Sequence, residues 1–314
     1  MELIGVWIGV VAGAFAIIGG GWKFCHFIYN RFFRPQTVDE PSPVECVATR
    51  FINLFQSHGV TASQIPKFFD HGLSIHQCSS IENLNSVLTN EMLDDAAALF
   101  AVNVDWLHGV TDQIYDGHDF YKYPTQYEHF LKKLLQTNHD FFAYAIKAQT
   151  HVSDHGYDAL LLISETIGDI NERRVYRYHI CKNWDIRYWK SRAYFAACCA
   201  ITLRSPRVPL IGRLAPQEWI QALSEGTELM EYDYEAFVGE PKLPGHSGWH
   251  IDEFVERPEV YLEGIGDEFG DNSANMAISM WLNLDKQGFM KVWDDGSHES
   301  VTANFKEYYN VNSS

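Results

Sequence analysis

The chain has 314 residues, 46% of them hydrophobic, which suffices for one large or two ordinary folded domains and excludes a disordered or fibrous protein. Its 24 Lys and Arg stand against 41 Asp and Glu, so the formal net charge of -17 repels nucleic acids and anionic lipid surfaces. Any such partner therefore needs a local basic patch. Six cysteines without a C-x-x-C pair indicate free thiols in a reducing compartment.

Residues 1–34 predict a transmembrane anchor and its juxtamembrane segment. Residues 3–22 carry no charge, and as a helix rising about 1.5 Å per residue they match the roughly 30 Å hydrocarbon core of a bilayer. Lys23, Arg31 and Arg34 follow, so the positive-inside rule places the N-terminus outside and the bulk of the chain in the cytoplasm. The bulky, basic residues after the span argue against a cleaved secretory signal. We therefore expect a single-pass protein whose lipid partner is the bilayer.

Gly5, Gly9 and Gly13 recur every four residues within this span. Such spacing puts three glycines on one helix face, where a second helix can approach closely. Two interpretations stay open: a homodimer through the membrane helix, or the ordinary abundance of glycine in membrane helices.

The remaining chain divides into four parts. Residues 35–43 are polar and proline-rich and predict a linker. Residues 44–115 show the pattern of several short helices, and residues 116–140 that of a helical connector. Residues 141–314 predict an α+β domain with an antiparallel sheet. Its strands are expected at 141–149, 159–167 and 173–181, the last two joined by a turn at 168–171, and its helices at 187–203 and 216–230.

A family resemblance covers about residues 46–113. Two apolar-patterned segments flank a turn at Gly72, and the closing part matches the pattern of an apolar helix followed by F-x-V-x-x-x-W-L-x-G. The matching residues are Leu99, Phe100, Val102, Val104, Trp106, Leu107 and Gly109. This segment resembles a Cro/C1-type (XRE-like) helix-turn-helix domain. The resemblance implies DNA binding through the second helix of the motif, with the candidate base contacts His76, Gln77, Ser79, Ser80 and Asn83. It also suggests a bacterial source, and hence the inner membrane.

The charge of the same segment opposes DNA binding. Between Cys46 and Gln113 the sequence holds two basic residues against seven acidic ones, a net of -5. Base readout depends on phosphate neutralisation by several Lys or Arg side chains. The residues therefore favour a helical module that serves as a protein-contact surface or a spacer, whereas DNA remains a disfavoured partner.

Residues 173–213 concentrate basic and aromatic side chains. Ten of the 24 basic residues fall here, with Asp185 the single acid among them. Guanidinium groups beside flat rings can bind phosphate-bearing ligands. The candidate anion-binding residues are Arg174, Arg177, Arg187, Lys190 and Arg192. The alternative is internal neutralisation, because the chain after Leu214 holds twenty acidic and only five basic residues.

No catalytic, cofactor or metal motif is complete. The pairs His151 with His155 and His246 with His250 have an i, i+4 spacing but lie among loop-forming residues. Cys198 and Cys199 fall in an apolar segment and are expected to be buried, inert thiols. The sequence therefore predicts no cofactor and no metal ion, and leaves catalytic residues unknown.

These observations favour a membrane-tethered cytoplasmic regulatory or sensor protein. In it, the helix-turn-helix-like module and the α+β domain bind a partner protein or an anionic ligand. One alternative is a membrane-localised enzyme acting on a phosphate-bearing substrate. It is favoured if two or more of the basic candidates share a pocket with acids such as Asp233, Asp252 or Glu253. A second alternative is a membrane-tethered DNA-binding transcriptional regulator.

Overall fold

The computed structural model describes residues 43–150, 156–233, 241–245, 247–265, 272–293 and 296–312. The predicted membrane anchor, with Gly5, Gly9 and Gly13, lies outside the described residues. Among those that are described, no helix combines the length and the hydropathy needed to cross a bilayer. Residues Glu45–Ser314 form one compact unit.

The first part of this unit is a bundle of short helices, as the sequence predicts. We call residues 43–107 the helical module. It consists of α2 (Pro43–Ser57), α3 (Ile65–Phe68), the 3-10 helix η2 (Gln77–Ser79), α4 (Ile81–Asn85), α5 (Asn90–Phe100) and α6 (Val104–Leu107). Thr89 and Asn103 accept hydrogen bonds from backbone N–H groups at the starts of α5 and α6. Arg50 of α2 links the first helix of the module to its last, because its guanidinium donates to the carbonyl oxygens of Trp106 in α6 and of Thr111 just beyond it.

A five-stranded sheet follows, with strand order β1-β4-β3-β2-β5. The strands are β1 (His118–Asp119), β2 (Phe141–Ala148), β3 (Ala159–Ile170), β4 (Arg173–Trp184) and β5 (Leu210–Ala215). The three predicted strands are present as β2, β3 and β4, paired antiparallel. Asn171 and Glu172 both have positive φ, the conformation that a two-residue hairpin turn demands.

The expectation of a purely antiparallel sheet is wrong, because the sheet is mixed. β1 pairs with β4, and β5 pairs with β2, both in parallel. The chain reaches β5 by a crossover through α8, which connects β4 to β5 past the two strands that lie between them, β3 and β2. β1 and β5 are short edge strands with few fully buried residues. Neither has the long apolar run from which the three central strands were predicted.

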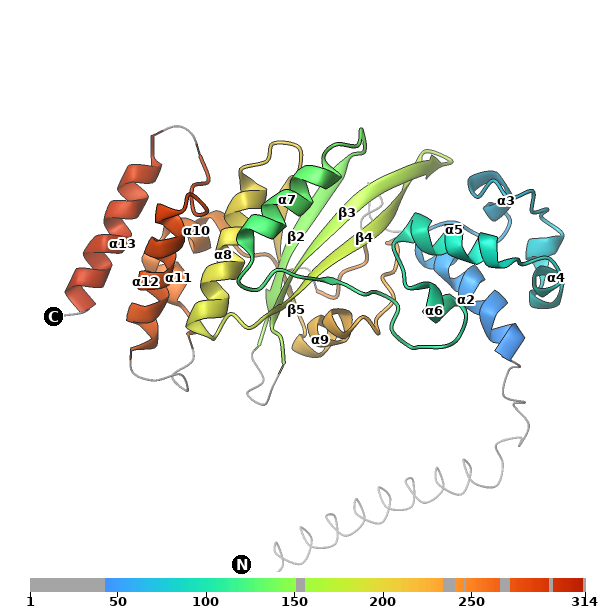
Figure 1. Cartoon of the computed structure of the whole chain (residues 1–314), viewed down its shortest axis with the longest axis horizontal. Coiled ribbons are helices and arrows are strands. Elements are labelled where there is room, and N and C mark those ends of the chain that lie inside the picture. Colours follow the sequence, from blue (N-terminus) through green and yellow to red (C-terminus); the bar gives the residue numbers. More distant parts are fainter. Residues whose placement is uncertain are drawn as a thin grey trace, which may run out of the picture. The chain divides into compact units, whose positions relative to one another are not determined.

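The remaining helices are α7 (Pro124–Leu134), α8 (Trp189–Leu203), α9 (Gln217–Glu225), α10 (Ile251–Glu256), α11 (Pro258–Leu262), α12 (Ser273–Lys286) and α13 (His298–Asn312). Figure 1 shows α8 between the sheet and the C-terminal helices. Eleven of the fifteen residues of α8 are buried, which is typical of a central helix with apolar residues on most of its surface.

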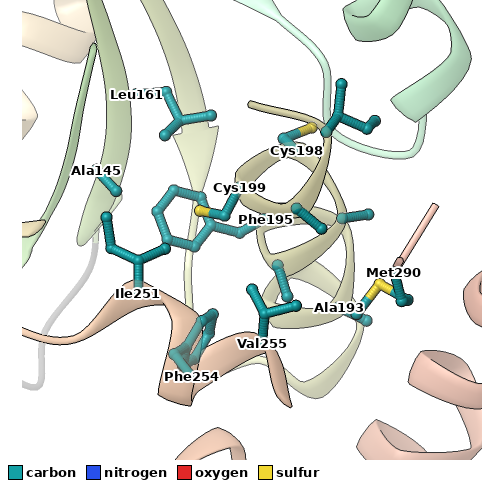
Figure 2. Packing of buried hydrophobic residues seen from close by; sticks show 14 of the residues in the cluster. Ala145, Leu161, Ala193, Phe195, Cys198, Cys199, Ile251, Phe254, Val255 and Met290 are labelled. Atoms are coloured by element: carbon teal, nitrogen blue, oxygen red, sulfur yellow. The ribbon is translucent and has the colours of Figure 1, made fainter. Parts of the chain in front are cut away.

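The two faces of the sheet have different cores. One face, here called the α8 face, carries Ala145, Leu161 and Cys181 and packs on α8. Figure 2 shows Ala145 and Leu161 opposite Phe195 and Cys199 of α8. The other face, here called the module face, carries Tyr144, Leu162 and Tyr178, which share a core with α9 and with the helical module. A single compact unit therefore buries both faces of one sheet.

Candidate functional site

The five predicted anion-binding residues lie at two separate places. Arg174 and Arg177 belong to the first half of β4, whereas Arg187, Lys190 and Arg192 follow its end. At about 3.3 Å per residue, the strand between Arg177 and Trp184 spans roughly 20 Å. No single pocket therefore gathers all five. The enzyme alternative needs two or more of these residues in one pocket with acids such as Asp233, Asp252 or Glu253. Arg174 and Arg177 instead pair with Asp140 and Glu165.

Arg192 serves the fold. Its side chain is buried, and its guanidinium donates to the carbonyl oxygens of Ile186, Tyr261 and Glu263. Burial lowers the pKa of Arg192 to about 10, so the group stays charged near neutral pH. Arg192 thus ties the start of α8 to the end of α11, and an anion would have to displace these carbonyl groups.

Glu165 is the centre of an ionic network with one arginine and two histidines. Its carboxylate is fully buried on the α8 face. Arg177 donates through Nε and Nη2 to the two carboxylate oxygens, each at 2.7 Å. His179 Nε2 lies 2.7 Å and His139 Nδ1 lies 2.5 Å from the same carboxylate. Arg174 nearby pairs with Asp140 at 3.0 Å.

The electrostatics of Glu165 follow from two opposed effects. Burial alone would raise the pKa of this carboxyl, but hydrogen bonds from His179, Arg177 and His139 outweigh it and hold the pKa well below its usual range. The carboxylate is therefore ionised and its acceptor capacity is filled. Arg177 is therefore engaged within the protein, but its partner is Glu165 and not one of the acidic residues after Leu214 on which the internal alternative was based.

A further histidine, His118, lies close to His179 of this network. The ring centroids of His118 and His179 lie 6.2 Å apart. Burial, together with the nearby His179, lowers the pKa of His118, so this ring is neutral near pH 7. Within the described part of the chain, no three His, Cys, Asp or Glu side chains are arranged to hold a metal ion. His151, His155 and His246 lie outside that part.

The helix expected to read DNA is broken in two. Ser80 is extended and separates η2 from α4. The side chains of four candidate base contacts form hydrogen bonds within residues 74–83. Gln77 accepts from Ser74, Ser79 donates to the His76 carbonyl, Ser80 accepts from the Asn83 backbone, and the Asn83 amide donates to the His76 carbonyl. Of the five candidates, His76 contributes its backbone carbonyl to these bonds, and its side chain is exposed.

The helical module is fastened to the module face of the sheet. His58 stacks between Phe100 of α5 and Tyr178 of β4, with ring centroids 4.3 and 5.3 Å away. A Cβ added to Gly168 of β3 would lie 3.0 Å from the Phe68 ring, so a larger residue here would press against that ring. The backbone N–H of Tyr232 donates to the Ser57 carbonyl at 2.7 Å. The module is thus joined to the sheet by several independent contacts.

A cleft of about 660 Å³ opens where these parts meet, and we call it the interface cleft. The helical module contributes amide and hydroxyl side chains, and the segment after α9 contributes the opposite wall. The lining residues are Asn53, Gln56, Ser57, Thr61, Leu229, Glu231, Tyr232 and Lys242. Glu231 and Lys242 form an ion pair at 2.8 Å. The cleft is therefore polar, and its opposite charges pair with each other.

His58 lies next to this cleft and is fully buried. Its Nδ1 approaches the Leu54 carbonyl at 2.7 Å, and since a carbonyl only accepts, Nδ1 carries the proton. Burial lowers the pKa of His58 to about 4, against the weaker raising effect of that carbonyl. The ring is therefore neutral near pH 7, and Nε2 is left as a hydrogen-bond acceptor.

Sequence reasoning missed His58 and Tyr178. His58 lies within residues 46–113, where the helix-turn-helix resemblance points to other residues. Tyr178 is one of many aromatic residues within residues 173–213. The alternation along residues 173–181 does predict the outcome in part: Tyr176 and Tyr178 share one strand face and Arg177 and His179 the other. Cys198 and Cys199 are buried as predicted, and burial raises the pKa of each thiol.

No protein-family model, curated protein or solved structure matches this chain.

Proposed function

We propose that this chain is a membrane-anchored regulatory protein that binds a small ligand in the interface cleft and contacts a partner protein through the helical module. The observation that carries the proposal is the lining of the cleft. Asn53, Ser57 and Thr61 come from the helical module, and Leu229 and Glu231 come from the segment after α9. A ligand that touches both parts stabilises their joined arrangement over any other, which is the physical basis of ligand-dependent regulation.

Two further observations support the regulatory role over DNA reading. The four side chains bonded within residues 74–83 would have to exchange internal partners for bases. The segment 46–113 also carries a net charge of -5, which opposes contact with phosphates. Membrane anchoring rests on the uncharged residues 3–22, and deletion of residues 1–34 should move the chain from the membrane pellet to the supernatant.

The cleft is tested with the full chain, purified in mild detergent. Small molecules released on denaturation are identified by mass spectrometry for the wild type, Asn53→Trp and Thr49→Trp. Both positions are exposed on α2, one helical turn apart, but only Asn53 lines the cleft. We expect the wild type and Thr49→Trp to release the same molecule and Asn53→Trp to release less than a tenth as much. Equal release from all three variants, or none from any, contradicts the proposal.

A further inference from the structure

A second cavity, of about 1020 Å³, is an open groove along α12, and we call it the α12 groove. Most of its lining residues belong to α12, and it shares none of them with the interface cleft. Trp189 at the start of α8 and Tyr309 of α13 also line it, and Figure 1 shows α12 between these two helices. The groove therefore lies in the C-terminal helices, apart from the site discussed above.

Uncharged hydrogen-bonding side chains run along the α12 side of the groove. Asn275, Ser279 and Asn283 recur every four residues, so they follow one face of the helix at steps of about 6 Å. In an extended peptide, residues on the same side recur about every 6.6 Å. An amide side chain both donates and accepts, as a peptide group does. The row therefore matches the repeat of an extended backbone.

Apolar surface and positive charge accompany this row. Met276, Met280 and Trp189 line the groove, and the flexible methionine side chains adapt to differing partners. Lys286, at the C-terminal end of α12, is the one charged group among the described lining residues. The ammonium of Lys190 lies over the Trp189 ring, 5.9 Å from its centroid. In a chain of net charge -17, the groove is thus a local site for an acidic partner.

The polar row decides which kind of occupant fits. A lipid chain or the apolar face of a helix would cover the exposed side chains of Ser279 and Asn283 without offering them hydrogen bonds, which costs free energy. An extended peptide presents unpaired N–H and C=O groups that bond to such side chains. Its alternate side chains are then free to contact the methionines and Trp189.

We propose that the α12 groove binds an extended, acidic peptide segment of a partner protein. Backbone groups of the segment bond to Asn275, Ser279 and Asn283, and a carboxylate of the segment contacts Lys286. Between Asn272 and Lys286 the helix rises about 21 Å, which accommodates about six extended residues at roughly 3.3 Å each. This surface is additional to the partner contact of the helical module and does not depend on the ligand of the interface cleft.

The test measures the fluorescence anisotropy of labelled peptides of about six residues, added to the full chain in mild detergent, with detergent alone as the blank. The first peptide alternates leucine with glutamate, and the second alternates leucine with lysine. The third repeats the first with N-methylated backbone amides, which removes the backbone donors and keeps the charge. We expect the first peptide to bind and each of the others to bind at least about ten times more weakly.

Two matched pairs of variants locate the binding. Lys286→Glu reverses the charge in the groove, whereas Lys306→Glu reverses an exposed lysine of α13 outside it. Ser279→Trp fills the groove, whereas Asn304→Trp places the same ring at an exposed position of α13 outside it. We expect the first variant of each pair to weaken binding of the acidic peptide at least about fivefold, and the second less than about twofold.

Failure of the acidic peptide to bind at about 1 mM, equal binding of the basic peptide, or equal effects within either pair of variants would overturn the inference. Equal binding of the N-methylated peptide would also overturn it, because the groove would then take an apolar anion without bonding to a peptide backbone. None of these results affects the release of small molecules from the interface cleft, which tests the proposed function separately.

Discussion

The buried charges on the α8 face and four buried neutral groups on the module face differ in how they are paired. On the α8 face, the buried charges are saturated: Glu165 accepts bonds from Arg177, His179 and His139, and Arg192 donates to three carbonyl groups. On the module face, Ser164, Thr166, Tyr178 and His58 keep unpaired atoms next to a cleft. A saturated network holds a fold together, whereas unpaired neutral groups beside a cleft suit ligand binding. The contrast indicates that paired charges stabilise the α8 face, and it agrees with our proposal that a ligand binds on the side of the module face.

Loss of Arg192 should have the largest effect on stability. Arg192→Leu leaves the carbonyl groups of Ile186, Tyr261 and Glu263 buried without their donors. We expect the free energy of unfolding to fall by about 4 kcal/mol in urea titrations. Lys190→Leu, two residues away on the same helix, is the control and should change it by less than about 1 kcal/mol. Similar values for both variants would show that the α8 face does not depend on saturated charges.

His58 gives the module face a specific acid sensitivity. Its folded-state pKa of about 4 lies below the ordinary value of 6.5, so the unfolded chain binds more protons between these pH values. The contribution is complete above pH 6.5 and is lost as the pH falls toward 4, by about 3 kcal/mol at most.

His58→Phe should remove this loss from the pH profile of the unfolding free energy. His76→Gln, at an exposed position in the same module, should leave the profile unchanged. Identical profiles for the wild type and His58→Phe between pH 6.5 and 4 would contradict a buried neutral imidazole.

Asp158 should make the free energy of unfolding depend on pH in the opposite direction. It is buried at the start of β3 and accepts from the Ile186 N–H at 2.7 Å. Burial raises the pKa of Asp158 from 3.8 to about 7, so the folded chain retains a proton that the unfolded chain releases. Its contribution is complete below pH 3.8 and declines as the pH rises toward 7, by about 4 kcal/mol at most. Asp158→Asn should flatten that decline, and an unchanged slope would refute the raised pKa.

Glu165→Gln should produce a smaller loss, about 2 kcal/mol, because Arg177 and His139 are partly exposed and regain water. The depressed pKa of Glu165 stabilises the fold above pH 4.5, and this contribution is lost as the pH falls below that value. The variant should lack that acid-dependent loss. Asp169→Asn, at an exposed position of the same strand, should retain it.

The sequence predicts the three central strands because they are long and rich in β-branched, aromatic and aliphatic residues. It cannot predict the partners of Glu165. The hairpin turn pairs Ile170 with Arg173, but the register shifts by one residue between Thr166 and Gly168. Without this bulge Glu165 would be paired with Tyr178, and with it Glu165 faces Arg177. A single irregular residue therefore decides which side chains meet.

The helical module shows the same limit. Apolar spacing predicts where its helices lie, and Thr89 and Asn103 are typical caps. The break at Ser80 follows from short polar side chains that bond to the local backbone and compete with a continuous helix. The pairing of His58 with Tyr178 depends on how the module packs on the sheet, which no local pattern encodes.

Hydrogen exchange of the full chain, before and after removal of bound small molecules, tests ligand binding in the interface cleft most directly. The reporter groups are the N–H of Tyr232, bonded to the Ser57 carbonyl, and the N–H groups of His58 and Val60, bonded to the Phe55 carbonyl. We predict that exchange at these groups becomes at least ten times faster after removal, while exchange within β2 and β3 stays the same. Unchanged exchange at the three groups, or an equal increase in β2 and β3, would contradict the account.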